Sequence, residues 1–522
     1  MITTPGITRP SNADAIVSKL LPLVKSTSDA TALVTSPLDG QTVCNIPVSN
    51  AQDVTDAFKI AKAAFSTWHE TNISTRISYI NNFHDLLLKN SETILDIVQW
   101  ENGKTRSSGM DEILDIALTC QYYAKVSKKL LKPKSRLGAF PVVTVVKELH
   151  HPLGVVGVIS PWNYPLTLAV SDFIPALIAG NTVVIKPDLQ TPLSALVLID
   201  LLYQAGIPGE VIQVVMGEGA EIGPQIVAQS DFVMFTGSTR VGREVAASAG
   251  ARLIPASMEL GGKNSLIIDK TVDIPKAVEI AVRGAFANSG QLCIGTERIV
   301  VHESVYDEFL AAFVAAVSQM KLGSEIGWGF DMGTLINERQ ITNAEKQIAD
   351  AVSKGAKVEV GGKRRPEIGP FVFEPTVLSE VSNEADICSI ETFGPVCSVY
   401  KWHYDEDLVE FVNNTDYGLS AGIVSKNISW ANRIAGRLHV GGVNINEAFA
   451  SAYASIDAPM GGMKQSGVGR RHGVAGLLKY TESQTIARQR WMKLGPQWGM
   501  NDKGWASFAK RMVRILRTKD FK

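Results

Sequence analysis

The chain has 522 residues, of which 45% are hydrophobic and 20% are charged. This composition is typical of a globular protein with a large core, and the length corresponds to about three domains. Lys and Arg together number 51 and Asp and Glu number 52, which excludes an overall positive field that would bind nucleic acid.

Cysteine and histidine spacing gives no sign of a metal site or a disulfide framework. No two of the five cysteines have CxxC spacing, and the eight histidines form no HExxH motif. The N-terminus lacks a basic segment followed by an apolar run, and the most apolar window, 166–186, is interrupted by polar residues and proline. We therefore expect no secretory signal, no membrane span and a cytoplasmic location.

Helical patterns dominate the first 130 residues. Residues 1–35 are rich in Thr, Ser and Pro around a short apolar helix signal, and we expect a surface arm there. An amphipathic helix is predicted from 53 to 68, where apolar residues recur at helical spacing: Val54, Ala57, Phe58, Ala61 and Phe65. The β-branched run VVTVV that follows LLKPKSRLGAF predicts a strand leaving this lobe.

Short apolar runs then alternate with helical stretches. These runs are GVVGVIS, TVVIKP, VIQVVM and FVMFTG. Strands that are buried on both faces have this composition, so the order predicts an α/β fold with a parallel sheet. A second alternating region opens at SLIID near 265 and reaches about 460.

The tail after residue 490 has a different pattern. An apolar stripe at helical spacing comprises Trp505, Phe508, Met512, Ile515 and Leu516. Basic residues are interleaved with it: Lys503, Lys510, Arg511, Arg514, Arg517 and Lys519. This predicts a basic amphipathic helix. We favour a helix packed on its own domain over contact with an anionic membrane or a neighbouring subunit.

Two glycine-containing segments are candidates for a phosphate-binding loop. GEGAEIG at 217–223 has one residue too many for the GxGxxG fingerprint, and we interpret it as a turn. In FTGSTRVG, a strand ends at Gly237 and a helix is expected to begin near Thr239. Gly237 and Gly242 would let a ligand approach the backbone, and Ser238 with the free N–H groups of the helix would face a pyrophosphate.

Cys293 is the strongest candidate for covalent chemistry. It lies in NSGQLCIGTER, among glycines and polar residues rather than in an apolar stripe. A thiolate nucleophile needs a base, an oxyanion donor and an electron acceptor. Glu259 in MELGGKN, Asn163 in PWNYP and a dinucleotide at Ser238 would supply these, although each residue alone is also compatible with a structural role.

Seven motifs occur in the order seen in the aldehyde dehydrogenase superfamily, which the chain resembles from about 40 to 490. The motifs are PWNYP, VIKP, FTGSTRVG, MELGGKN, GQLC, ETFGPV and PMGGMKQSGVGR. The resemblance implies a Rossmann-type dinucleotide domain, an α/β catalytic domain and a small β arm for oligomerisation. The expected segments are an N-terminal arm at 1–35, the dinucleotide-binding domain at 36–132 and 153–260, the catalytic domain at 261–460, the oligomerisation arm at 133–152 and 480–490, and the tail at 491–522.

The resemblance also implies roles for individual residues. Cys293 matches the nucleophile that forms a thiohemiacetal and then a thioester, Asn163 the oxyanion donor and Glu259 the general base. Lys186 and Glu391 match residues that hold the two riboses, and Trp162 and Ser238 match adenosine and pyrophosphate contacts. The remaining cofactor-site candidates come from the same motifs: Gly237, Gly242, Leu260 and Phe393. No metal is implied, and the expected assembly is a homodimer or homotetramer.

The chain departs from the family pattern at the predicted cofactor site. Family members often have a carboxylate three residues after the lysine of VIKP, where it binds the adenosine 2′-hydroxyl, whereas this chain has Leu189. A carboxylate would repel a 2′-phosphate and Leu189 does not, so we expect NADP to be accepted, with NAD as the alternative. Asp188 is the residue that argues against this expectation.

A second departure is a double charge reversal. Many family members have lysine at the position of Asp172 and glutamate at that of Arg471. Because both signs are reversed, we predict an Asp172–Arg471 ion pair near the catalytic pocket.

The sequences of the segments GVGRRHG and YTESQT resemble those of a succinate-semialdehyde dehydrogenase branch. Better-known enzymes of that branch bind the substrate carboxylate with two arginines, at the positions of Ser171 and Ala287. Succinate semialdehyde therefore needs another cation here, such as Arg283 or Arg471. An uncharged aromatic or aliphatic aldehyde is the alternative substrate. Transfer to coenzyme A instead of water is disfavoured, because CoA-acylating relatives commonly lack a base at the position of Glu259.

Overall fold

A six-stranded sheet forms the centre of the first domain. The computed structural model describes residues 6–140 and 143–517. The strand order is β19-β9-β8-β5-β6-β7, with all neighbours parallel except β19, which is antiparallel to β9. The strands are β5 (Val155–Ile159), β6 (Thr182–Lys186), β7 (Ile212–Val214), β8 (Phe232–Thr236), β9 (Ala256–Glu259) and β19 (Gly467–Val468). The four predicted apolar runs are β5, β6, β7 and β8, and these strands are buried because helices cover both faces.

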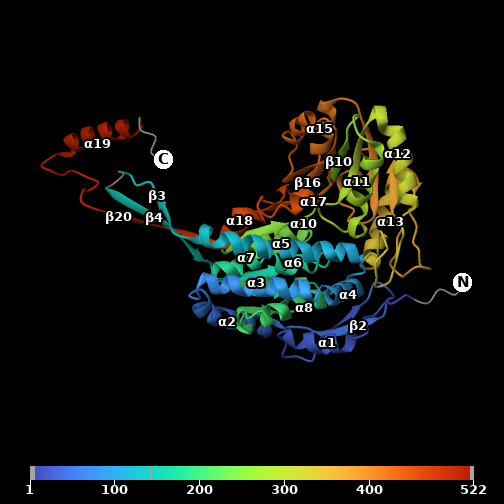
Figure 1. The fold of residues 1–522 in the computed structure, drawn as a ribbon, viewed down its shortest axis with the longest axis horizontal. Helices are drawn as coiled ribbons and strands as arrows, with labels where there is room; N and C mark the ends of the chain where they lie inside the picture. The colour runs from blue at the N-terminus through green and yellow to red at the C-terminus, as the bar shows by residue number, and fades with distance from the viewer. Residues whose placement is uncertain (1–5, 141–142, 518–522) are drawn as a thin grey trace.

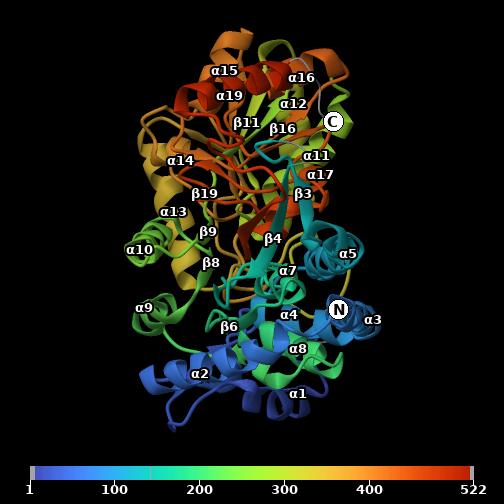
Figure 2. The ribbon, with the colours of Figure 1, turned by 90° about the vertical axis from the view of Figure 1, so that its left-hand side faces the viewer.

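Helices cover this sheet on both sides (Figures 1 and 2). One side has α2 (Ala51–Trp68), α9 (Gly219–Gln229) and α10 (Thr239–Ala251). The other has α3 (Ile73–Lys89), α4 (Ser91–Asn102), α5 (Arg106–Leu131), α6 (Thr167–Val170), α7 (Ile174–Ala179) and α8 (Pro192–Gln204). The predicted helix at 53–68 is confirmed as α2, whose apolar stripe packs against the strands.

The N-terminal segment packs against this domain instead of projecting as a surface arm. Helix α1 (Ala13–Leu20) buries Ala13 and Leu20 in the same core as α8, and the short turn η1 (Leu21–Leu23) follows it. Strands β1 (Thr31–Thr35) and β2 (Thr42–Pro47) form an antiparallel hairpin. A domain boundary at residue 35 would cut this hairpin in two. Over residues 6–35, the structure therefore differs from the surface arm expected from the sequence.

The second domain contains a seven-stranded sheet in the order β12-β13-β14-β11-β10-β16-β17, parallel except for β12. Its strands are β10 (Asn264–Ile268), β11 (Thr296–His302), β12 (Lys357–Val360), β13 (Thr376–Ser379), β14 (Val396–Trp402), β16 (Ser420–Val424) and β17 (Gly442–Ile445). Its helices are α11 (Ile274–Phe286), α12 (Glu303–Ser318), α13 (Glu338–Ser353), α14 (Asp386–Ser389), α15 (Asp405–Asn413), α16 (Ile428–Ala435) and α17 (Ala450–Tyr453). A two-stranded sheet pairs β15 (Tyr417–Gly418) with β18 (Met463–Lys464).

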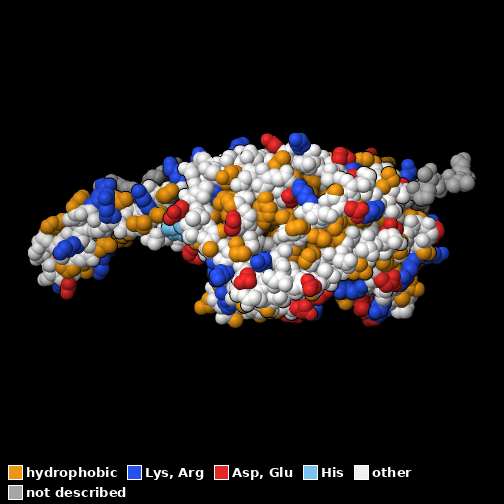
Figure 3. Space-filling model, turned by 90° about the horizontal axis from the view of Figure 1, so that it is seen from below, with side chains coloured by type: hydrophobic (Ala, Val, Ile, Leu, Met, Phe, Trp, Pro, Cys, Tyr) orange, Lys and Arg blue, Asp and Glu red, His pale blue; other side chains and the backbone are white. Residues whose placement is uncertain are grey.

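A three-stranded antiparallel arm projects from the body (Figures 1 and 3). It consists of β3 (Lys134–Arg136), β4 (Thr144–Pro152) and β20 (Thr481–Gln489), which lie within the two stretches expected for it. Helix α18 (Gly473–Leu478) precedes β20, and the predicted tail helix is α19 (Asp502–Arg517).

The tail helix packs on its own arm, as favoured from the sequence. Four residues of its apolar stripe contact the arm residues Phe140 and Val143 and the nearby Met492: these four are Trp505, Phe508, Met512 and Leu516. Ile515, expected in the same stripe, is half exposed. The basic side chains of the described part of the tail are exposed, namely Lys503, Lys510, Arg511, Arg514 and Arg517, whereas Lys519 lies outside the described residues.

The chain passes directly from one sheet to the other at the site. Glu259 ends β9 and Asn264 begins β10. Side chains from both domains consequently meet around the segment between these two residues.

Candidate active site

One cavity, of ≈ 630 Å³, connects the first sheet to Cys293. Ten of the eleven residues predicted for the site line it: Trp162, Asn163, Lys186, Gly237, Ser238, Glu259, Leu260, Cys293, Glu391 and Phe393. Gly242 does not. It lies in α10, where a Cβ atom would come within 2.4 Å of the Leu260 side chain, so a glycine here allows the helix to pack closely.

Cys293 lies at the end of a tightly bent loop. Asn288 and Ser289 have φ values of 51° and 56°, in the left-handed region that costs non-glycine residues conformational energy. A Cβ on Gly290 would be 2.1 Å from the carbonyl oxygen of Gly394, so only glycine allows this loop to approach the ETFGPV loop. Burial, with help from Glu391 and Glu259, raises the pKa of the Cys293 thiol to about 12. The isolated thiol therefore requires a base to ionise.

Glu259 lies at the end of β9, where its carboxyl group is almost fully buried. Its Oε1 atom has no hydrogen-bond partner among the described residues. Burial raises the pKa of Glu259 to about 7, while Arg471 and Lys479 oppose the rise. A carboxylate with a pKa near neutrality is suited to general-base catalysis.

Asn163 and Trp162 are held by buried hydrogen bonds, including one from Asn102 Nδ2 to the Trp162 carbonyl at 2.8 Å. The side-chain Nδ2 of Asn163 donates to the carbonyl of Gln291 at 3.1 Å, two residues before the cysteine. The Asn163 carbonyl accepts bonds from Lys104 at 2.8 Å and from Asn288 at 3.0 Å. Because the amide nitrogen carries two hydrogens, the second remains for a ligand.

Glu391 and Phe393 enter the cavity from the ETFGPV loop. Glu391 Oε1 accepts a bond from the Gly262 amide at 2.9 Å. A Cβ on Gly261 would lie 2.4 Å from Glu391 Oε2, and one on Gly262 would lie 2.7 Å from the Cys293 carbonyl oxygen, so both positions of the glycine pair in MELGGKN are closely packed. Burial and Glu297 raise the pKa of Glu391 to about 8. Phe393, with φ of 52°, places its ring edge-to-face on Trp162 at 5.6 Å.

The opposite end of the cavity has the chemistry of a dinucleotide site. Ser238 is the N-cap of α10, and its hydroxyl accepts from the Val241 amide at 3.5 Å. Lys186 ends β6 and donates to the Pro187 carbonyl at 3.1 Å. Burial lowers the pKa of Lys186, partly offset by Asp188 and Glu218. Leu189 and Asp188 line the same region.

The segment GEGAEIG is a helix start rather than the expected turn. Glu218 is the N-cap of α9, which begins at Gly219, and three glycines of the segment line the cavity. The helix start was missed because the glycines hide its apolar periodicity.

Several positioning residues were not predicted. Glu297 accepts bonds from the Thr392 and Phe393 amides, and Lys263 Nζ contacts its carboxylate at 2.5 Å. Asn264 Nδ2 binds the carbonyls of Cys293 and Gly295 at 2.7 and 2.8 Å. Lys263 and Asn264 end the MELGGKN motif, so their place in that motif was the available signal.

The predicted Asp172–Arg471 ion pair is confirmed. Arg471 Nε lies 2.7 Å from Asp172 Oδ1, and the side chains are only 4% and 3% exposed.

Arg283 has a half-exposed side chain, in contrast to the buried Arg471. Arg283 lies in α11 with its side chain 55% exposed and its guanidinium 5.8 Å from the centre of the Phe449 ring. Its contact with Asp111 is loose, at 3.9 Å. Tyr164, buried in the same apolar cluster as Leu168, Leu292 and Phe449, is within electrostatic range of both Cys293 and Arg283.

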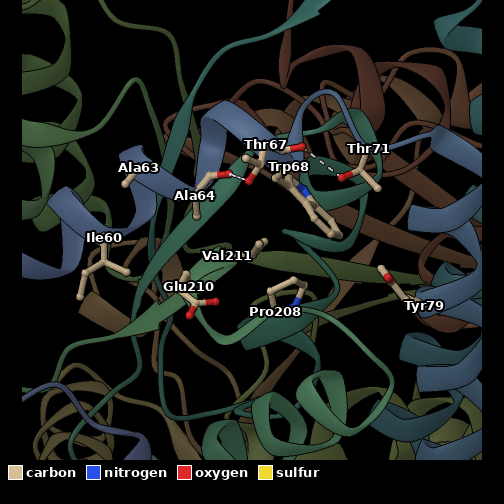
Figure 4. Close-up of a pocket in the computed structure, with 10 residues that line it drawn as sticks. All are labelled: Ile60, Ala63, Ala64, Thr67, Trp68, Thr71, Tyr79, Pro208, Glu210 and Val211. Carbon is tan, nitrogen blue, oxygen red and sulfur yellow. Dashed lines mark hydrogen bonds between the residues drawn. The ribbon is translucent and has the colours of Figure 1, made fainter.

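A second cavity, of ≈ 360 Å³, lies between α2, α3 and the short turn η2 (Gly209–Val211), as Figure 4 shows. It is mainly apolar and shares no lining residue with the first cavity. In the described part of the chain, no cluster of three or more His, Cys, Asp or Glu side chains suits a metal ion. No helix within the described ranges has the length and apolar character needed to cross a membrane.

Comparison with known proteins places this geometry in a family. Residues 23–486 match the model described as "Aldehyde dehydrogenase family". The chain belongs to this family. The match to the family model thus covers both domains and extends into β20, the last strand of the arm.

Individual relatives agree with this assignment. A Mycobacterium ulcerans protein named "Putative succinate-semialdehyde dehydrogenase (NADP(+)) 2" is 44% identical over 513 residues, 98% of each chain. The crystal structure of succinate-semialdehyde dehydrogenase from Burkholderia pseudomallei has a TM-score of 0.85 and 34% identity, covering 89% of this chain and 96% of that one. An E. coli NADP-dependent enzyme has a TM-score of 0.86 and 31% identity, covering 90% and 96%.

Proposed function

We propose that this aldehyde dehydrogenase oxidises succinate semialdehyde to succinate with NADP, through a thioester on Cys293. The observation that carries the proposal is that Cys293, Glu259, Asn163 and Glu391 line the same cavity as Ser238 and Lys186. The names of the relatives support the substrate and the cofactor.

In this mechanism the Cys293 thiol releases its proton to water in the cavity, and the thiolate sulfur attacks the aldehyde carbon. The resulting oxyanion is stabilised by the free hydrogen of Asn163 Nδ2 and by the Cys293 amide. A bound NADP would supply the hydride acceptor, so that the carbon held by Cys293 Sγ is left as a thioester. Glu259 then takes a proton from water, the hydroxide attacks the thioester, and cleavage of the C–S bond releases the carboxylate.

The residues present fit a dinucleotide. The cavity runs from the N-termini of α9 and α10 to Cys293, and helix N-termini stabilise phosphate groups. Lys186 and Glu391 would hold the riboses, with Trp162, Leu260 and Phe393 forming apolar walls. Gly237 would allow close backbone approach at the end of β8.

Replacing Leu189 tests the choice of cofactor. We expect Leu189→Glu to lower kcat/KM for NADP at least about tenfold and to change the value for NAD far less, because the new carboxylate repels a 2′-phosphate beside Lys186. Leu189→Gln is the control with the same shape and no charge. Steady-state kinetics with both cofactors measure the effect. Equal losses for both variants, or a wild-type kcat/KM for NADP more than tenfold below that for NAD, would contradict the proposal.

Arg283 is the cation best placed to bind the carboxylate of succinate semialdehyde. Its guanidinium is half exposed beside Phe449 and is held only loosely by Asp111. Arg471 is already paired with Asp172 and fully buried. Phe449, over which the Arg283 guanidinium lies, belongs to the same apolar cluster as Tyr164 and Leu292, and Cys293 packs against this cluster.

Substrate selectivity provides the test. We expect the wild type to prefer succinate semialdehyde over butanal by more than about a hundredfold in kcat/KM, and Arg283→Gln to lower that ratio at least about tenfold through a higher KM. Lys276→Gln, on the exposed side of α11, should leave the ratio unchanged. A wild-type ratio near one would instead favour an uncharged aldehyde.

We also infer that the arm mediates assembly of a homodimer or homotetramer. The inference is supported by β20, which lies at the edge of the arm sheet and has mainly exposed side chains. Unpaired strand edges are normally covered by another chain. The five free cysteines fit a reducing cytoplasm.

A further inference from the structure

The segment that carries Arg471 of the reversed ion pair follows β19, the strand that pairs with β9, and β9 ends at the proposed base Glu259. Strand β19 pairs with β9 such that Gly467 is opposite Glu259, and Arg471 follows four residues later. A bridge between Met460 and Arg471 fixes the backbone there, with N–O distances of 2.9 and 2.7 Å. Asp172 approaches from the connection between α6 and α7.

The pair leaves polar atoms without partners in a buried region. Arg471 Nη2, Asp172 Oδ2 and Glu259 Oε1 are all buried and lack hydrogen bonds among the described residues. A buried guanidinium that is only partly satisfied by its ion partner exerts a strong field on nearby carboxylates. Glu259 is the catalytic candidate within that field.

Five other groups interact electrostatically with Glu259 from the surrounding elements. Lys479, at the end of α18, contacts Ser257 Oγ at 3.3 Å and opposes the rise in the Glu259 pKa. Arg470 acts in the same direction with the smallest effect, and Asp172 acts in the opposite direction. Cys293 and Tyr480 are also within electrostatic range of Glu259. Arg471 has the largest effect of the charged neighbours, so position 471 dominates position 172 at the base.

We propose that Arg471, anchored by Asp172, is an electrostatic positioning residue that keeps Glu259 ionised for hydrolysis of the thioester. The inference rests on the proposed role of Glu259 as general base. The proposal gives the charge reversal a consequence, because Arg471 is the member of the pair that acts most strongly on Glu259. A glutamate at position 471, paired with a lysine at position 172, would instead favour the protonated form of Glu259.

The test exchanges the two charges. Asp172→Lys combined with Arg471→Glu keeps a buried pair but reverses its direction. We expect the acidic limb of the pH–kcat profile to move up by about one unit, and the rate at pH 6 to fall about tenfold. Hydrolysis of an activated ester, which forms an acyl-enzyme without cofactor, should show the same shift. The amplitude of the first NADPH burst should not change.

Two further variants keep the test decisive. Arg470→Gln removes the neighbouring arginine, whose influence on Glu259 is smallest, and should leave the acidic limb in place. If the exchanged pair does not fold, Asp172→Asn with Arg471→Gln removes both charges and should also raise the limb, because the effect of Arg471 exceeds that of Asp172. A folded variant of either kind with a wild-type profile overturns the inference. Unchanged turnover in Glu259→Gln would instead refute the proposed base, which is a separate result.

Discussion

Replacement of Cys293 by alanine is expected to abolish aldehyde-dependent reduction of NADP, with a loss in kcat of at least about 10⁴-fold. No other cysteine lines the cavity, and the remaining four are buried elsewhere. The covalent intermediate therefore has no alternative sulfur. Cys293→Ser should be nearly as inactive, because a hydroxyl is much harder to ionise than a thiol in the same buried position.

The measurement combines steady-state rates with thiol labelling. A thiol reagent should modify one cysteine rapidly in the wild type, and that reaction should be lost in Cys293→Ala. Cys388→Ala is the matched control, since Cys388 lies in α14 and does not line the cavity. Substantial turnover in folded Cys293→Ala would refute the covalent mechanism.

Glu259→Gln is expected to separate the two halves of the reaction. The first turnover should still release about one NADPH per active site, whereas steady-state turnover should fall about 10²–10⁴-fold because water loses its base. An added strong nucleophile such as hydroxylamine should restore turnover, since it attacks the thioester without general-base assistance.

The pH dependence of the wild type has a defined direction. Burial raises the pKa of Glu259 to about 7, so the base is increasingly protonated below that pH. We therefore expect kcat to fall as the pH decreases through about 7, and this limb to be absent from the residual rate of Glu259→Gln. A variant that lost the NADPH burst together with steady-state turnover would show that Glu259 acts before the thioester forms.

Features that depend on short stretches of chain could be predicted from the sequence alone. Buried parallel strands were predicted because their residues are continuously apolar, and α2 was predicted because its apolar residues repeat every three or four positions. Cys293, Glu259 and Asn163 were identified as site candidates because each lies in a recognisable motif. Charge reversal at two positions was enough to predict the Asp172–Arg471 pair.

The contacts by which distant segments hold the site became visible only in the folded chain. Glu297 binds the amides of the ETFGPV loop and Asn264 binds the carbonyls of the cysteine loop. Such bonds join strands and loops far apart in sequence, and local periodicity contains no information about them. The same reason explains the N-terminal segment: its short apolar signal resembles a surface arm until the core around α8 is present to bury Ala13 and Leu20. The proposed action of Arg471 on Glu259 depends on the pairing of β19 with β9, a register that the sequence does not specify locally.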